Sequence, residues 1–342
     1  MQRQRREGTN VAVGVRNSFP LLVADIGGTN ARFGWIARAG APLSAVETLL
    51  CADYLRVEDA ALAYLRKFHG AARPARTAIA IASAISPGSI KVTNSHWVLE
   101  RHEFAQHVGA DSTDVFNDFE AIAMALPYLT TDDYRLVGVA APDAAYAMGV
   151  IGPGTGLGVA GVVPIRGEAG RWQTLCGEGG HVTLAGATVY QSEILRAARQ
   201  HYTHVSAERL VSGIGLPTLR RAVAEVEGLP VERELSAEEI GTLGANRADP
   251  LCEKTMEAFC SLLGSVAGNL ALTLGARGGV FIAGGIVPKL GEFFVRSGFR
   301  EHFEAKGRYV EYLREISTPV ITTPYPGLRG LVRNAMRGTS TV

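Results

Sequence analysis

The chain has 342 residues, of which 47% are hydrophobic and 20% are charged, and its formal net charge is +1. This balance is typical of a folded globular protein and argues against intrinsic disorder. A net charge so close to zero gives no field that would attract nucleic acid or an anionic membrane, so we expect neither as a partner. At this length the chain has room for two domains, each with its own core.

The cysteines and the chain start favour a cytoplasmic location. The four cysteines are scattered, with no C-x-x-C pair and no zinc spacing; they are Cys51, Cys176, Cys252 and Cys260. This pattern favours reduced thiols. Residues 1–18 begin with several arginines and lack the long apolar segment of a signal peptide, so we expect a disordered basic tail. The longest strongly apolar run, 78–85, is much shorter than a membrane span.

Taken in chain order, the first clear element is a hairpin around a glycine turn. An apolar run over 21–26 reaches Gly27, Gly28 and Thr29, and a second apolar run follows over 31–37. Glycines leave backbone N–H groups unshielded by side chains, so an anion can approach closely, and a threonine hydroxyl adds a donor. One such turn is a weak indication of phosphate binding.

Strands and helices are expected to alternate along the remaining chain. The expected helices are 59–68, 119–126, 191–201, 253–274 and 328–337, and the expected strands are 77–82, 90–92, 115–116, 147–151, 158–163 and 280–283. This alternation predicts an α/β protein with mixed sheets. The polar, turn-rich segment 130–142 is expected to cross between two domains. We place the small α/β domain at 19–131 plus 322–342 and the large one at 132–321.

A second glycine–threonine turn lies between the strands expected at 147–151 and 158–163. It contains Gly154, Thr155 and Gly156, and it repeats the pattern of the first turn. Two such turns predict two lobes that face each other across a polyphosphate.

Two common nucleotide-binding motifs would imply a different kind of site. No G-x-x-x-x-G-K-[ST] segment is present, which excludes a P-loop. Residues 156–161 do match G-x-G-x-x-G, but that motif requires a helix to open at the glycines. The valines at 159, 162 and 163 favour a strand instead, so a dinucleotide site is not expected.

Six segments together resemble the bacterial glucokinase family, which has the actin/hexokinase/Hsp70-type fold. The resembling segments are 25–32 and 154–160 for phosphate, 279–288 for adenosine, and 117–119, 177–181 and 204–209 for the sugar. They occur in the family's order and span about 21–330. The resemblance implies a two-lobed, ribonuclease H-like α/β fold with mixed sheets and an ATP/sugar cleft between the lobes. It also implies ATP-dependent phosphorylation of D-glucose to glucose 6-phosphate, the first step of glycolysis, by a homodimer.

Asp118 is the residue we expect to act as general base. It follows a strand end and precedes a helix, where a carboxylate is held rigidly, and phosphoryl transfer needs a group that takes the nucleophile's proton. The alternative is that Asn117 or Asp118 only caps the helix. The resemblance favours catalysis, with Asn117 bonding to sugar hydroxyls.

Three further residues are expected to bind the sugar. Glu178 and His181 lie in a glycine-rich turn that can aim both side chains at one ligand, and a hexose needs paired donors and acceptors. A plain solvated turn and a metal site are the alternatives, although Glu-x-x-His without another nearby ligand is a poor zinc site. Glu208 suits a helix start on its own, and only the resemblance makes it a sugar ligand.

The expected nucleotide site draws on both turns and on the adenosine segment. Its residues are Ala24, Asp25, Ile26, Gly27, Gly28, Thr29, Gly154, Thr155, Gly156, Gly284 and Gly285. A carboxylate among phosphates needs a divalent cation between them, so Asp25 is expected to contact Mg²⁺, through water if the ion keeps its hydration shell. Tight turns without a ligand are the alternative for any single glycine.

The chain also departs from a wider group of sugar kinases and repressors. It lacks the cysteine-rich zinc motif of that group, and the residues before 21 are too few for a DNA-binding helix-turn-helix. We therefore expect a kinase without structural zinc. A kinase for another hexose and a non-catalytic sugar sensor of the same fold remain alternatives.

Overall fold

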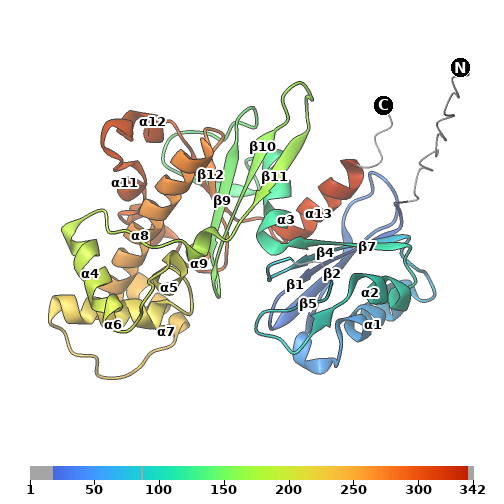
Figure 1. Ribbon diagram of the computed structural model, residues 1–342, viewed down its shortest axis with the longest axis horizontal. Coiled ribbons are helices and arrows are strands. Elements are labelled where there is room, and N and C mark those ends of the chain that lie inside the picture. The colour runs from blue at the N-terminus through green and yellow to red at the C-terminus, as the bar shows by residue number, and fades with distance from the viewer. Residues whose placement is uncertain (1–17, 86–87, 338–342) are drawn as a thin grey trace, which may run out of the picture. The chain divides into compact units, whose positions relative to one another are not determined.

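The computed structural model describes residues 18–85 and 88–337 (Figure 1). The predicted disordered tail therefore lies outside the described residues except for Ser18, which is buried. The described chain forms two compact units. The first contains 18–79, 88–115 and 332–337, and the second contains 80–85 and 116–331.

The first unit is built on a five-stranded sheet in the order β3-β2-β1-β4-β7. Its elements are β1 (Leu21–Ile26), β2 (Asn30–Ile36), β3 (Ser44–Leu50), α1 (Val57–His69), β4 (Arg76–Ile81), β5 (Ile90–Lys91), β6 (Val98–Leu99), α2 (Arg101–Val108) and β7 (Ser112–Asn117). The last residues of β4 and β7 belong to the second unit. Figure 1 shows α1 and α2 side by side on one face of the sheet.

Burial explains why these residues form these strands. The central strands β1 and β4 are buried at almost every position, as strands covered on both faces are. The edge strand β3 is partly exposed along its length. The predicted first hairpin is confirmed, because β1 and β2 pair antiparallel on either side of the glycine turn. That register places Asp25 opposite Arg32.

The second unit contains a six-stranded mixed sheet in the order β11-β10-β9-β12-β13-β8. Its strands are β8 (Tyr134–Val137), β9 (Met148–Pro153), β10 (Leu157–Pro164), β11 (Trp172–Cys176), β12 (Val280–Ile282) and β13 (Thr318–Ile321). The pair β9–β10 is the predicted second hairpin, so the G-x-G-x-x-G segment is a strand, as expected. The strand β12 runs parallel to β9, which makes the sheet mixed.

Helices supply most of the second unit's core. They are α3 (Asp118–Ala125), α4 (Val189–Arg199), α5 (Ala207–Leu210), α6 (Leu216–Glu227), α7 (Ala237–Ala245), α8 (Pro250–Leu274), α9 (Ile286–Leu290), α10 (Glu292–Arg296), α11 (Phe299–Glu304), α12 (Val310–Arg314) and the start of α13 (Pro326–Arg337). The residues of α13 from 332 onward belong to the first unit. Short 3₁₀ turns lie at Cys51–Asp53, Leu126–Tyr128, Gly179–His181 and Gly307–Tyr309.

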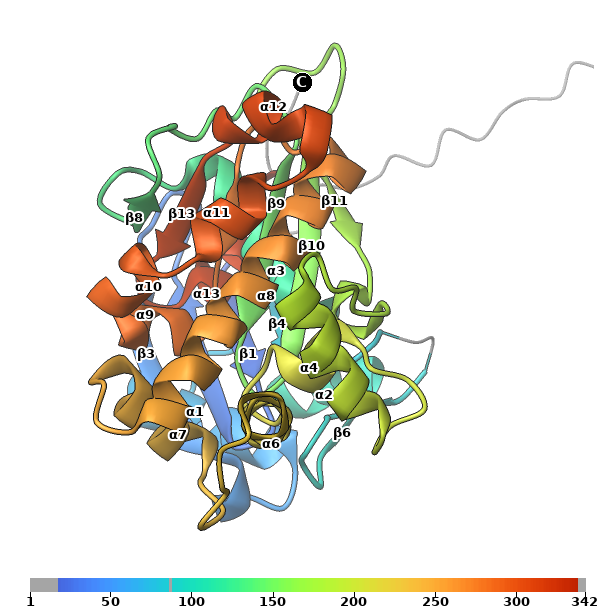
Figure 2. The ribbon, with the colours of Figure 1, turned by 90° about the vertical axis from the view of Figure 1, so that its left-hand side faces the viewer.

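The long helix α8 is a core helix. By length and composition it resembles a membrane span, yet 61% of its most apolar window is buried inside the protein. Figure 2 shows α8 in orange, with α11 and α7 packed along it. It begins at Pro250, three residues before the expected start, because the Asp249 side chain caps the helix and proline suits its first turn.

Two expectations about chain organisation differ from these compact units and stay predictions. The segment 130–142, predicted to cross between domains, lies within the second unit and contains β8. The compact units also divide the chain elsewhere than the predicted limits at 131 and 322. The chain from 116 onward belongs to the second unit because α3 packs on β9 and β10 there.

Asp133, just before β8, ties three parts of the second unit together. Its carboxylate accepts hydrogen bonds from the Thr130 amide at 2.9 Å and from the Arg329 guanidinium. Its backbone oxygen accepts from the amides of Thr322 and Thr323. Burial acts to raise the pKa of this carboxyl, but the bonds from Thr130 and Arg329 outweigh it and lower the pKa to about 2.

We predict that Asp133→Asn lowers the free energy of unfolding by about 1.5–3 kcal/mol, the usual contribution of hydrogen bonds to a charged group. A depressed carboxyl pKa stabilises the folded state fully above the ordinary value of 3.8 and ceases to do so as the pH falls toward about 2. Urea unfolding from pH 7 downward measures both effects. The exposed neighbour Asp132 is the matched control, and an equal loss in Asp132→Asn would contradict the prediction.

Candidate active site

The first glycine turn closes the hairpin of β1 and β2. The Gly27 amide donates to the Asn30 carbonyl at 2.9 Å, and the Cys51 amide donates to the Thr29 carbonyl at 2.9 Å. Thr29 itself is exposed, as a phosphate-binding hydroxyl must be. A Cβ on Gly28 would lie 2.8 Å from the Thr93 carbonyl oxygen, so this glycine also allows a loop of its own unit to approach.

Three of the predicted nucleotide residues lie on β1. The side chains of Ala24 and Ile26 are fully buried in the core, so only their backbone is available to a ligand. Asp25 points the other way, with its side chain 25% exposed, and its Oδ2 lies 3.4 Å from Nη1 of Arg32. Burial raises the pKa of the Asp25 carboxyl, and the charge and hydrogen bond of Arg32 oppose that rise.

The second glycine turn is braced from a neighbouring segment. The amides of Gly213 and Ile214 donate to the carbonyls of Gly154 and Thr155, at 2.8 and 3.1 Å. Thr155 is exposed, and a Cβ on Gly154 would meet no atom within 4 Å. The turn thus exposes its backbone at Gly154 and the Thr155 hydroxyl, while two backbone hydrogen bonds hold it in place. The supporting Gly213–Ile214 pair was not predicted, because its only local signal is a glycine on either side of Ile214.

Gly284 and Gly285 follow β12 beside this turn. Gly284 has a φ of +80°, and a Cβ on it would lie 2.7 Å from the Pro153 carbonyl carbon, so glycine is required there. Gly285 precedes α9, and a Cβ on it would meet no atom within 4 Å. Gly284 therefore packs on the end of β9, whereas Gly285 leaves open backbone of the kind predicted for the nucleoside.

The structure brings three of the predicted sugar residues together. Oε1 of Glu208 lies 3.9 Å from Nδ1 of His181, and Nε2 of His181 lies 4.0 Å from Oε2 of Glu178. The side chains of Glu178 and His181 are more than half exposed. The other oxygen of Glu208 accepts from the Leu157 amide at 2.9 Å. Glu208 therefore joins this cluster to the end of the second glycine turn.

Asn117 and Asp118 form the start of α3. The Asn117 side chain caps the helix, because its Oδ1 accepts from the amides of Phe119 and Glu120 at 2.9 and 3.3 Å. Its amide nitrogen donates to the Ser83 carbonyl at 3.3 Å. The capping alternative thus holds for Asn117, and a sugar contact must use its remaining N–H. Asp118 is the first residue of the helix, with Oδ1 3.0 Å from the Phe119 amide nitrogen.

Thr174 and the Phe119 ring hold the first turn of α3. The Thr174 hydroxyl donates to the Glu120 carboxylate at 2.9 Å. The Phe119 ring packs on the glycines of the β9–β10 hairpin. The signal for this packing was the glycine content of the hairpin, which we assigned to phosphate binding alone.

Metal binding and thiol chemistry were tested against the residues present. In the part of the chain that the structure describes, no three His, Cys, Asp or Glu side chains form a group able to hold a metal ion. The single carboxylate of Asp25 is compatible with Mg²⁺, because this ion commonly takes one or two carboxylates together with water and phosphate oxygens. Partial burial and the neighbouring Glu120 raise the pKa of the Cys176 thiol to about 11, so it is protonated at neutral pH.

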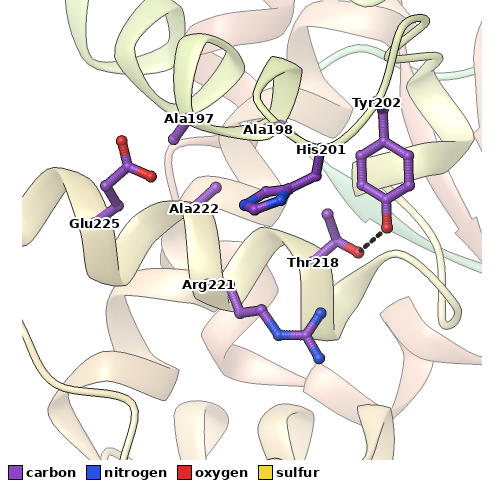
Figure 3. A pocket seen from close by; sticks show the side chains of 8 residues that line it. All are labelled: Ala197, Ala198, His201, Tyr202, Thr218, Arg221, Ala222 and Glu225. Carbon is purple, nitrogen blue, oxygen red and sulfur yellow. Dashed lines mark hydrogen bonds between the residues drawn. The ribbon is translucent and has the colours of Figure 1, made fainter.

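A cavity of about 240 Å³ between α4 and α6 lies apart from these residues (Figure 3). None of the candidate residues lines it. Three of its polar side chains have partners: Arg221 pairs with Glu234 at 2.8 Å, Tyr202 contacts Thr218 at 3.3 Å, and Glu225 accepts from Gln200 at 2.8 Å. His201 also lines the cavity. The cavity contains neither of the two glycine turns and none of the predicted sugar residues.

Comparisons with known proteins agree on one family. The family model of glucokinase matches residues 22–337. A glucokinase of Aromatoleum aromaticum is 42% identical over 328 residues, which is 95% of this chain and 98% of the relative. The crystal structure of a glucokinase from an Antarctic psychrotroph has a TM-score of 0.83 and 34% identity, covering 93% of this chain and 99% of that one.

A more distant structure supports the fold alone. The ROK family glucokinase of Streptomyces griseus, solved with glucose and AMPPNP, has a TM-score of 0.60 at 19% identity, covering 92% of this chain and 98% of that one. The predicted fold class, a mixed-sheet α/β protein of the actin/hexokinase type, is confirmed.

We predict that the Asp25 carboxyl titrates above its ordinary value of 3.8, because burial disfavours its charged form. Replacing Arg32 with leucine removes the opposing charge and moves the midpoint higher still. The measurement is ¹³C NMR of the carboxyl carbons across pH, with Asp25→Asn identifying the resonance. A midpoint at or below 3.8, or a lower midpoint in Arg32→Leu, would contradict the assignment.

Proposed function

We propose that Asp118 is the general base of the reaction that this chain catalyses. The chain belongs to the glucokinase family, and it phosphorylates D-glucose with ATP. The position of Asp118 carries the proposal: it begins a helix that packs on the hairpin bearing Thr155. Its Oδ1 accepts from the Phe119 amide, which orients the carboxylate. A fixed carboxylate beside a phosphate-binding turn suits proton removal during phosphoryl transfer.

The phosphoryl group is then transferred in a single displacement. Asp118 takes the proton of the sugar 6-hydroxyl while that oxygen attacks the γ-phosphorus of ATP. The bond between this phosphorus and the β–γ bridging oxygen breaks, and ADP leaves with the electron pair. Positioning and charge stabilisation supply most of the catalysis in such a transfer. The product, glucose 6-phosphate, enters glycolysis.

Glucose is held by Asn117, Asp118, Glu178, His181 and Glu208. The imidazole between two carboxylates offers a donor and several acceptors within one cluster, which is what a ring of hydroxyls requires. A hydroxyl left unpaired against such groups is costly, so the cluster can discriminate among hexoses.

ATP is held by both glycine turns and by the adenosine segment. Thr29 and Thr155 bind phosphate oxygens with their hydroxyls, helped by backbone amides of Gly27, Gly28, Gly154 and Gly156. Ala24 and Ile26 contribute backbone only, and Gly284 and Gly285 lie against the nucleoside. Asp25 would hold Mg²⁺ through water, and this ion would neutralise phosphate charge.

The cellular setting follows from the same premise. The four cysteines are free, three of them buried, which fits a reducing cytoplasm. The net charge of +1 favours neither nucleic acid nor membrane as a partner. A homodimer is the assembly expected for the family. A sensor without catalysis is not favoured, because the relatives are kinases.

We predict that Asp118→Asn lowers kcat about 10²- to 10⁴-fold, the usual contribution of a general base, while ATP affinity changes little. A coupled ADP-release assay gives kcat, and calorimetry gives the ATP affinity. Asp132→Asn, which removes an exposed carboxylate from the same unit, should leave kcat unchanged. Activity of Asp118→Asn close to that of the parent would show that another group is the base.

A side-by-side panel of glucose, mannose, fructose and N-acetylglucosamine tests the sugar assignment. We expect the highest kcat/KM with glucose. His181→Ala should lower kcat/KM for glucose more than tenfold, since it leaves two carboxylates without their shared partner. A higher kcat/KM with another hexose would show that this other sugar is the preferred substrate.

A further inference from the structure

We propose that Phe119 is a positioning residue, which fixes the Asp118 carboxylate by seating its ring in a notch between Gly152 and Gly158. We call these two residues the glycine notch. The inference rests on the proposed role of Asp118. It assigns to two glycines of the second turn's hairpin a function other than phosphate binding.

The notch is a consequence of strand register. Gly152 of β9 and Gly158 of β10 are direct partners in the antiparallel hairpin. Directly opposed residues of an antiparallel pair project on the same face of the sheet. Where both are glycine, two neighbouring side chains are missing from that face, and the sheet has a hollow one ring wide.

The Phe119 ring fills this hollow. A Cβ on Gly158 would overlap the ring, and a Cβ on Gly152 would lie 2.6 Å from its Cζ. Real Cβ atoms essentially never come that close, so any larger residue must displace the ring or the strand. Neither glycine has a left-handed φ, so the backbone itself does not require glycine here. The ring accounts for Gly158, and at Gly152 the ring and the Ala283 carbonyl carbon, 2.8 Å from the added Cβ, both leave no room for a side chain.

The ring and the carboxylate are adjacent along a rigid turn. The Phe119 amide nitrogen lies 3.0 Å from Asp118 Oδ1 and 2.9 Å from Asn117 Oδ1. A shift of the ring therefore moves the N–H that orients the proposed base. On the other side of α3, Gly330 lets α13 approach the Ala121 carbonyl, so the helix is confined between two surfaces.

The same hairpin carries Thr155 in the turn between the notch residues. Seating Phe119 in the notch thus fixes the proposed base relative to a proposed phosphate ligand within one compact unit. A displacement of about 1 Å between reacting groups costs about 10²-fold in rate. Phe119 therefore acts on kcat through Asp118 and touches no reacting atom.

The test uses Gly158→Ala, Phe119→Ala and the double variant. The methyl group in Gly158→Ala expels the ring, and we expect kcat to fall about 10²-fold with KM for glucose and ATP within about threefold of the parent. Phe119→Ala should lower kcat at least about tenfold. In the double variant the methyl has room, so adding Gly158→Ala to Phe119→Ala should change kcat less than about threefold.

Gly161→Ala is the matched control. It places the same methyl on the same strand but on the opposite face, 2.7 Å from Leu274 Cδ1 of α8. It should lower the unfolding temperature and leave kcat, measured per folded molecule by active-site titration, unchanged. A merely structural role for the notch predicts that Gly158→Ala behaves like Gly161→Ala.

The outcomes separate this inference from the proposed function. If Asp118→Asn loses activity while Gly158→Ala and Phe119→Ala keep the parent kcat, the positioning role is wrong and the base assignment stands. If Asp118→Asn keeps its activity, the base assignment is wrong, and the positioning role that depends on it is wrong as well. If Gly158→Ala does not fold, Phe119→Ala and the double variant decide, and equal kcat in the parent and Phe119→Ala overturns the proposal.

Discussion

The close packing of α3 against the β9–β10 hairpin is the constraint on which the candidate active site depends. Phosphoryl transfer leaves little covalent chemistry to the protein, so its rate rests on where the base and the phosphate ligands lie. Here the proposed base and a proposed phosphate ligand lie on two elements that pack together, since Asp118 begins α3 and Thr155 lies in the turn of the β9–β10 hairpin. The paired glycines Gly152 and Gly158 allow this approach, and a side chain at either position would require the Phe119 ring or the neighbouring backbone to shift.

The sugar cluster depends on the same hairpin. Glu208 accepts from the Leu157 amide at the end of the second glycine turn and lies 3.9 Å from His181. The Gly213–Ile214 segment holds the turn itself through two backbone hydrogen bonds. Residues proposed for the base, the sugar and the phosphate therefore share a frame within the second unit. Asp25 and Thr29, which are proposed for Mg²⁺ and phosphate, belong to the first unit.

Local sequence patterns predicted part of the elements, because hydrophobic periodicity and glycine turns act over short distances. The strands β3, β11 and β13 and the helices α2, α6 and α7 were not predicted. Both hairpins, the capped start of α3 and the C-terminal end of α8 at Gly275 follow from such patterns. Long-range packing is not encoded locally. The glycine notch needs the register of two strands and the approach of a helix, and the Asp133 bonds join residues as far apart as Thr130 and Arg329. For the same reason the compact units end elsewhere than predicted.

Single-turnover rapid-quench kinetics of Asp118→Asn test the central claim most directly, because they isolate the chemical step from product release. With enzyme in excess over ATP and with saturating glucose, the account predicts a phosphoryl-transfer rate at least about 10²-fold below that of the parent enzyme, with both ligands bound. A transfer rate equal to that of the parent would contradict the account.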